Sequence, residues 1–149
     1  MVTINDVAKY FLKLQDEKTG DMISNMKLQK LVYYAQGFHL AITDSPLFPE
    51  TLEAWDYGPV CDKLYQEYKE YGAGAIPTPD DNEFYNKFTK NVEDILDMVQ
   101  TYYGQFSAWK LSELTHKEYP WLRAWNKGKN TPISHDDMKS YFKAQLISE

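Results

Sequence analysis

The stretch "NMKLQKLVYYAQGFHLAI", residues 25–42, decides the fold of this 149-residue chain. Apolar side chains recur in it at intervals of three and four residues, which places them on one face of an α-helix. The stretch therefore predicts a long helix, with Lys27, Lys30 and Tyr34 on a neighbouring face. The apolar face consists of Leu28, Leu31, Val32, Ala35, Phe38 and Ile42.

Similar periodic patterns surround this stretch and predict a mainly α protein. The segment 51–57, "TLEAWDY", alternates in polarity and indicates a short strand. The loop-rich region 73–90 could add a second short strand. We therefore expect a compact bundle of six to seven helices with a small β element around residues 51–57. No linker or repeat divides the chain, so 1–149 is expected to be a single domain. Helices are expected over 4–16, 59–71, 91–103 and 108–118, around 121–125 and over 136–147.

Composition excludes several classes of protein. The net charge is −6 and the chain has a single Arg, Arg123, whereas binding to a phosphate backbone relies on Lys and Arg. We therefore expect no nucleic-acid partner. A lone Cys cannot form an intramolecular disulfide, and no apolar run reaches the roughly 18–20 residues that span a bilayer. The cysteine usage and the absence of a membrane-spanning run lead us to expect a cytoplasmic protein without a membrane partner. The histidines lack metal-ligand spacing, so we expect no metal and no cofactor.

The stretch "EAWDYGPVC", residues 53–61, interrupts the helical pattern with a rigid aromatic turn. Gly58 permits a sharp bend and Pro59 fixes its own backbone, so the rings of Trp55 and Tyr57 are held at little entropic cost. The turn could be a catalytic loop around Cys61, a buried structural corner or a surface for a partner. From the residues alone, the last two remain equally favoured.

His116 is the histidine that bears most on whether the turn at 53–61 is catalytic, structural or a partner surface. It lies in "LSELTHKEYPW", residues 111–121, among polar and aromatic residues. Its ring could pin that corner of the chain or shape a functional surface. Nucleophilic catalysis at Cys61 would need a base such as His116 to be brought close by folding.

Three stretches together resemble the Panacea antitoxin domain, a family that includes SocA-like and GepA-like phage-associated proteins. They are "KLQKLVYYAQGFHLA" (27–41), "PLFPETLEAWDYGPVCDKLYQEYKEYG" (46–72) and "GQFSAWKLSELTHKEYPWLRA" (104–124). Their order and spacing agree with the family over nearly the whole chain. The resemblance implies a helical, non-enzymatic antitoxin that binds and blocks a cognate protein toxin encoded by a neighbouring gene.

The resemblance also carries alternatives. SocA-like members are understood to deliver their toxin to a cytoplasmic protease, so a proteolytic adaptor is the second expectation. A third, which comes from the residues and not from the resemblance, is an enzyme that uses His116 to modify a small molecule. A homodimer is compatible with the sequence.

The resemblance names candidate site residues. Those that match the family motifs are expected to build the scaffold or one shared groove lined by Lys30, Tyr57 and His116. The toxins differ across the family, so specificity is expected outside the motifs, in 72–90 and on the C-terminal helix. The motif residues are Lys27, Lys30, Tyr34, Trp55, Tyr57, Gly58, Pro59, His116 and Trp121. The aromatic candidates for toxin contact are Tyr10, Tyr65, Tyr85, Tyr102 and Trp125.

Overall fold

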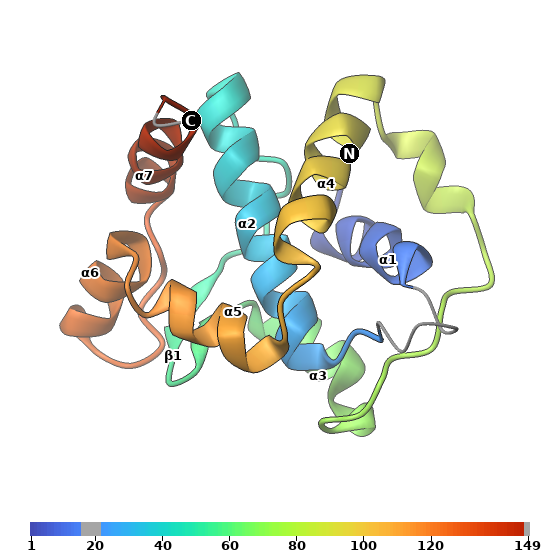
Figure 1. Ribbon diagram of the computed structural model, residues 1–149, viewed down its shortest axis with the longest axis horizontal. Coiled ribbons are helices and arrows are strands. Elements are labelled where there is room, and N and C mark those ends of the chain that lie inside the picture. Colours follow the sequence, from blue (N-terminus) through green and yellow to red (C-terminus); the bar gives the residue numbers. More distant parts are fainter. Residues whose placement is uncertain (16–21, 148–149) are drawn as a thin grey trace.

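The helix α2 (Asn25–Thr43) is the centre of the molecule, with α7 (His135–Ile147) on one side and α4 (Lys90–Tyr103) on the other (Figure 1). The computed structural model describes residues 1–15 and 22–147. Every residue from 27 to 41 is buried, so α2 is enclosed on all sides rather than on the one apolar face that its periodicity predicts. The predicted apolar face reaches the surface only near the end of α2, where Ile42 is exposed.

The remaining helices pack around α2 and confirm the expected mainly α architecture, with seven α-helices in the described residues. The helices α1, α3 and α5 contact α2 directly, whereas α6 lies against α7 and the first strand (Figure 1). The first helix ends at Leu14, and residue 16 of the expected span lies outside the described residues. The bounds are α1 Ile4–Leu14, α3 Asp62–Tyr68, α5 Ala108–Thr115 and α6 Tyr119–Lys127, with 3-10 helices η1 Lys69–Tyr71 and η2 Glu83–Lys87.

The β element is an antiparallel hairpin of β1 (Glu53–Trp55) and β2 (Gly58–Val60), in which Trp55 pairs with Gly58. A second short strand was considered possible in 73–90, but this region contains only η2, the first residue of α4 and a single bridge between Ser24 and Ala75. Pro59 therefore belongs to β2 rather than to a first helical turn. A proline is tolerated there because β2 is an edge strand and Pro has no N–H to donate.

The other edge of β1 is paired with the segment that leads into α7. The Ala54 N–H donates to the Thr131 carbonyl (2.9 Å), and the Asn130 N–H donates to the Ala54 carbonyl (2.8 Å). β1 is therefore held between β2 and residues 130–131. The tip of the hairpin thus has a fixed position relative to the helices.

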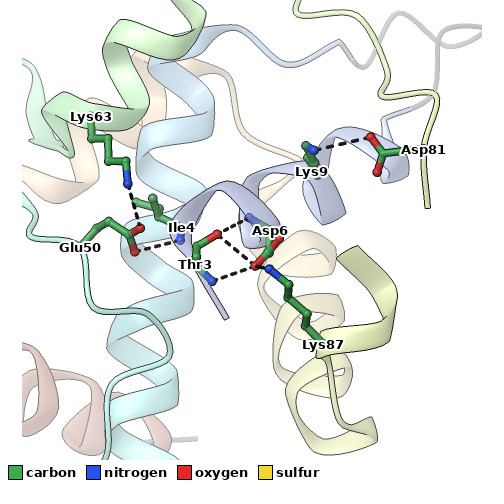
Figure 2. Close-up of polar contacts among 8 residues, drawn as sticks. All are labelled: Thr3, Ile4, Asp6, Lys9, Glu50, Lys63, Asp81 and Lys87. Carbon is green, nitrogen blue, oxygen red and sulfur yellow. Dashed lines mark hydrogen bonds and ion pairs between the residues drawn. The ribbon is translucent and has the colours of Figure 1, made fainter. Parts of the chain in front are cut away.

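A capping box starts α1 and ties it to η2 (Figure 2). The Thr3 hydroxyl accepts from the Asp6 N–H (3.2 Å), and the Asp6 carboxylate accepts from the Thr3 N–H (2.9 Å). The Lys87 ammonium lies 3.0 Å from the same carboxylate. Burial raises the pKa of Asp6, but the contacts with Thr3 and Lys87 outweigh it and hold the pKa below its ordinary value.

Two further contacts fasten α1 to its surroundings (Figure 2). The Glu50 carboxylate accepts from the Ile4 N–H (3.0 Å) and lies 3.7 Å from the Lys63 ammonium. On the far side of the helix, Lys9 pairs with Asp81 at 3.5 Å. Glu50 therefore joins the start of α1 to α3.

We expect Asp6→Ala to lower the free energy of unfolding by about 1–2 kcal/mol, because it removes the Asp6 half of the capping box and the ion pair with Lys87. Urea denaturation followed by tryptophan fluorescence measures the change. The pKa of Asp6 is lowered in the fold, so its contribution is present above the ordinary carboxyl value of 3.8 and is lost as the pH falls through the folded pKa. As a control, Asp81→Ala breaks only a half-exposed ion pair and is expected to change stability by less than about 0.5 kcal/mol.

Candidate functional site

A groove with a volume of about 680 Å³ lies beside the hairpin and is lined from α2, α3, α5 and the turn. This volume is within the range of roughly 300–1,000 Å³ that is usual for binding sites in proteins. The walls are mainly aromatic and apolar. We call this cavity the groove. Its characteristic lining residues are Met26, Lys30, Trp55, Tyr57, Tyr65 and Trp109.

The hairpin turn beside the groove is held by three hydrogen bonds from helices α5 and α6. The carbonyls of residues 55–57 each accept one, from Trp121 Nε1 (2.9 Å), His116 Nε2 (2.8 Å) and Ser112 Oγ (2.7 Å) respectively. A carbonyl can only accept, so Nε2 of His116 carries a proton. The His116 ring also lies edge-on against Trp121, with the centroids 4.4 Å apart. His116 therefore pins the turn.

A second, smaller cavity of about 170 Å³ adjoins the groove. Tyr57 and Trp109 line both cavities, whereas His116 lines only the smaller one and Lys30 only the larger. The structure thus places Lys30, Tyr57 and His116 around two neighbouring hollows that share the exposed rings of Tyr57 and Trp109.

Cys61 does not form a catalytic pair with His116 in the described part of the chain. Its side chain is 2% exposed and lines neither cavity, and its N–H donates to Gln29 Oε1 (3.0 Å). Burial raises the pKa of the thiol, whereas a nucleophilic cysteine needs a lowered pKa and access to substrate. Cys61 is therefore a packed residue at the start of α3.

Gly58 allows α2 and α5 to approach the turn closely. Its φ is 117°, a region that residues with a Cβ rarely adopt. An added Cβ would also lie 2.7 Å from Thr115 Oγ1 and 2.8 Å from Lys30 Cε. Both the backbone angle and the space thus require glycine, and Lys30 lies directly beneath it.

Lys30 is the most unusual polar residue of the groove. Its side chain is 0% exposed, and its ammonium has no hydrogen-bond partner in the part of the chain that the structure describes. Burial lowers the pKa of this ammonium to about 7, because a desolvated charge is disfavoured. A perturbed amine at a cavity is typical of functional sites.

Two other motif residues, Lys27 and Tyr34, belong to the interior rather than to the groove. The Lys27 ammonium donates to the Gly104 carbonyl (2.7 Å). The hydroxyls of Tyr34 and Tyr33 each donate to the Glu118 carboxylate (2.9 Å). Burial raises the pKa of Glu118 to about 7, although these two hydrogen bonds oppose the rise. These contacts connect α2 to the end of α4 and the start of α6.

The aromatic candidates for toxin contact lie in different places. Tyr65 lines the groove and packs against Trp55, with ring centroids 5.3 Å apart. Tyr102 is 56% exposed at the end of α4 and lines neither cavity. The structure therefore brings only Tyr65 to the groove and leaves Tyr102 as a separate surface ring.

The other three rings are partly or wholly covered. Trp125 is half-buried and stacks on Trp121 at 5.1 Å. Tyr85 is also half-buried and lies edge-on to Tyr10. Tyr10 itself is buried, which makes the expectation of a surface contact at Tyr10 wrong. It was misjudged because helical periodicity does not show which neighbours cover a ring.

Trp109 is the groove residue that the sequence analysis missed. It is 70% exposed and lines both cavities. Leu111 is the buried residue of that turn. Residues two apart on a helix do not share a face, so the spacing of Trp109 and Leu111 was a usable signal that one of them faces outward.

Metal sites and membrane-spanning helices are absent from the described residues. Among residues 1–15 and 22–147, no three His, Cys, Asp or Glu side chains gather as a metal site would require. In the same part of the chain, no helix has both the length and the apolar character needed to cross a membrane.

Comparison with known proteins identifies the family of the chain. The family described as "Antitoxin SocA-like, Panacea domain" matches residues 28–122, a range that includes Lys30, Tyr57 and Trp109. A 54-residue stretch, 36% of this chain, is 42% identical to Antitoxin SocA of Caulobacter vibrioides (strain NA1000 / CB15N). That stretch spans 29% of the relative's length. No solved structure gives a significant match. The chain belongs to the antitoxin SocA-like, Panacea domain family.

Proposed function

We propose that this protein is an antitoxin that neutralises the toxin of a neighbouring gene by binding it directly, and that the groove is the docking surface. Membership of the SocA-like family supports an antitoxin role and a non-enzymatic one. The direct mode of binding and the site are our proposal, for which the geometry around the hairpin provides the support.

The observation that carries the proposal is a pair of exposed aromatic rings on a rigid support. Tyr57 is 54% exposed and Trp109 is 70% exposed, and both border the groove and the smaller cavity. The backbone of the turn that carries Tyr57 is fixed by the bonds from Ser112, His116 and Trp121. Rigid Trp and Tyr side chains next to a hollow are the usual anchors of protein interfaces, because little entropy is lost when they bind.

The negative net charge of the chain favours a toxin of opposite charge. With a net charge of −6, the antitoxin attracts a basic toxin over long range, which speeds encounter and discriminates against acidic proteins. A stable complex is expected to bury on the order of 1,200–2,000 Å² in total. The groove and its rim would then form the centre of a larger contact.

We expect Trp109→Ala and Tyr57→Ala each to weaken toxin binding by at least about 2 kcal/mol, which is roughly 30-fold, because each removes an anchor ring. Isothermal titration calorimetry with the purified toxin measures the affinity, and growth under co-expression measures protection. Both rings are exposed, so the variants should keep the wild-type thermal unfolding profile.

Tyr102→Ala serves as the matched comparison, since Tyr102 is as exposed as Tyr57 but lies outside both cavities. We expect it to bind the toxin normally. If Tyr102→Ala weakens binding and the two groove variants do not, the docking surface lies at the end of α4 instead. If the wild-type protein is abundant, does not bind the toxin and does not protect the cells, direct neutralisation is ruled out.

The same co-expression distinguishes the remaining alternatives. A proteolytic adaptor would shorten the lifetime of the toxin, whereas a blocking antitoxin leaves it constant or extends it, so pulse-chase labelling separates the two. Delivery to a cytoplasmic protease and formation of a homodimer stay predictions from the family resemblance. An enzyme centred on His116 is disfavoured because its Nε2 proton is already donated to the turn and Cys61 is sealed in the core.

A further inference from the structure

We propose that the groove binds an acidic segment of the partner protein, and that an Asp or Glu side chain of this segment pairs with Lys30. The inference deepens the proposed function and rests on it for the identity of the partner as a toxin. It concerns the chemistry that the groove selects.

The first argument is the charge of the groove. Its charged lining residues are Lys30, Lys69 and Asp56. Asp56 is exposed and lies 3.6 Å from the Lys129 ammonium, so it already has a cationic partner. No acidic side chain pairs with Lys30 in the described residues. The groove is therefore locally short of negative charge within a chain whose net charge is −6.

The second argument is the environment of the Lys30 ammonium. Burial has removed the water that would solvate it, and the protein supplies no acceptor in the described residues. Leaving an ammonium in this condition is unfavourable, and an incoming carboxylate removes the penalty through a charge-assisted hydrogen bond in a medium of low dielectric. The four-carbon stem of lysine is flexible, which lets the ammonium turn towards a ligand.

The third argument concerns which carboxylate reaches this position. Lys30 lies against Gly58 and is fully buried, whereas the rings of Tyr57 and Trp109 are exposed. A partner segment whose backbone rests on these rings can reach Lys30 only with a side chain that extends inward. The aromatic side chains that line the groove then cover the methylene groups of an Asp or Glu side chain. Its carboxylate pairs with the Lys30 ammonium inside the groove.

The test measures the protons taken up on binding. Wild-type protein is titrated with purified toxin at pH 8 in two buffers of different ionisation enthalpy. Free Lys30, with a pKa of about 7, is then mostly neutral, whereas a paired carboxylate holds it as an ammonium. We expect an uptake of about 0.9 proton per complex. Lys30→Met, which replaces the stem of the side chain but removes the amine, should abolish the uptake and weaken binding by roughly 10-fold or more.

Lys27→Met is the matched control, because Lys27 is also a buried lysine of α2 but donates to the Gly104 carbonyl. It should retain the proton uptake. Exchanging toxin Asp and Glu residues one at a time for Asn and Gln should identify one variant that reproduces the loss, with no further loss when it is combined with Lys30→Met. A Gly-Ser tail on the toxin should have no effect; if it abolishes uptake, the ligand is the terminal carboxylate and the assignment to a side chain is wrong.

The outcomes separate this inference from the proposed function. Toxin binding without proton uptake, or with equal uptake in Lys30→Met, overturns the pairing at Lys30 and leaves the antitoxin function intact. The absence of any binding by the wild-type protein overturns both.

Discussion

Gly37→Ala is expected to destabilise the protein by about 3 kcal/mol, because a single added methyl group has no room. A Cβ at Gly37 would overlap the Cδ2 and Cε2 atoms of the Phe142 ring. That ring is buried between α2 and α7 and touches other rings, including Phe38 at 4.7 Å and Tyr141 at 5.0 Å, so it cannot move aside freely. The result is opposite to helix propensity, which favours alanine over glycine by about 1 kcal/mol.

Urea denaturation followed by circular dichroism measures this change, and Phe142→Leu supplies the rescue. The smaller side chain frees space, so the double variant should be less destabilised than the sum of the two single ones. Gly72→Ala is a suitable control, since no side chain of the described residues lies within 4 Å of its added Cβ and only its backbone, at φ 55° and ψ −129°, opposes it. It should cost about 1–2 kcal/mol. A neutral Gly37→Ala would mean that α2 and α7 are not in close contact.

Lys30→Met is expected to stabilise the free protein at pH 7 by on the order of 4 kcal/mol. Burial lowers the pKa of Lys30 from 10.5 to about 7, and each pH unit corresponds to about 1.36 kcal/mol. Between pH 7 and pH 10.5 the unfolded chain binds one more proton than the folded protein. The stability of the wild-type protein therefore rises as the pH increases from 7 to about 10.5. Methionine removes this penalty because it needs no proton and no partner.

Urea midpoints at pH 7 and pH 9 test the prediction. The gap between Lys30→Met and wild type should be largest at pH 7 and should narrow at pH 9. Lys27→Met should instead destabilise by about 1.5–3 kcal/mol, because it deprives the buried Gly104 carbonyl of a charged donor. Equal destabilisation by both variants would show that Lys30 is satisfied in the folded protein. A functional residue that reduces stability is consistent with the usual trade-off between binding sites and stability.

The helical framework could be predicted because its signals are local. The start of α1 is marked by Thr3 and Asp6, whose capping box needs only residues three apart. The strand at 53–55 was also predictable from alternation. Its partner was not, because Pro59 suits both a first helical turn and an edge strand, and only the pairing of Ala54 with Pro59 distinguishes them.

The groove could be predicted only in part. The motif residues Lys30 and Tyr57 do line it, but Trp109 was missed and Lys27 and Tyr34 proved to be interior residues. Periodicity assigns residues to faces of one helix and does not say whether a face is covered. α2 is covered on every face, and its polar side chains are buried with the apolar ones.

The order of residues along the chain alone determined the positions of the helices, the bend at Gly58 and the family to which the chain belongs. The tertiary structure alone decided that residues 55–57 are pinned by side chains 55 to 66 positions away, and that Lys30 lies beneath Gly58 without a partner in the described residues. The reason is physical: helix formation and turns depend on neighbours within about four residues, whereas desolvation and hydrogen bonding depend on which distant segments pack together.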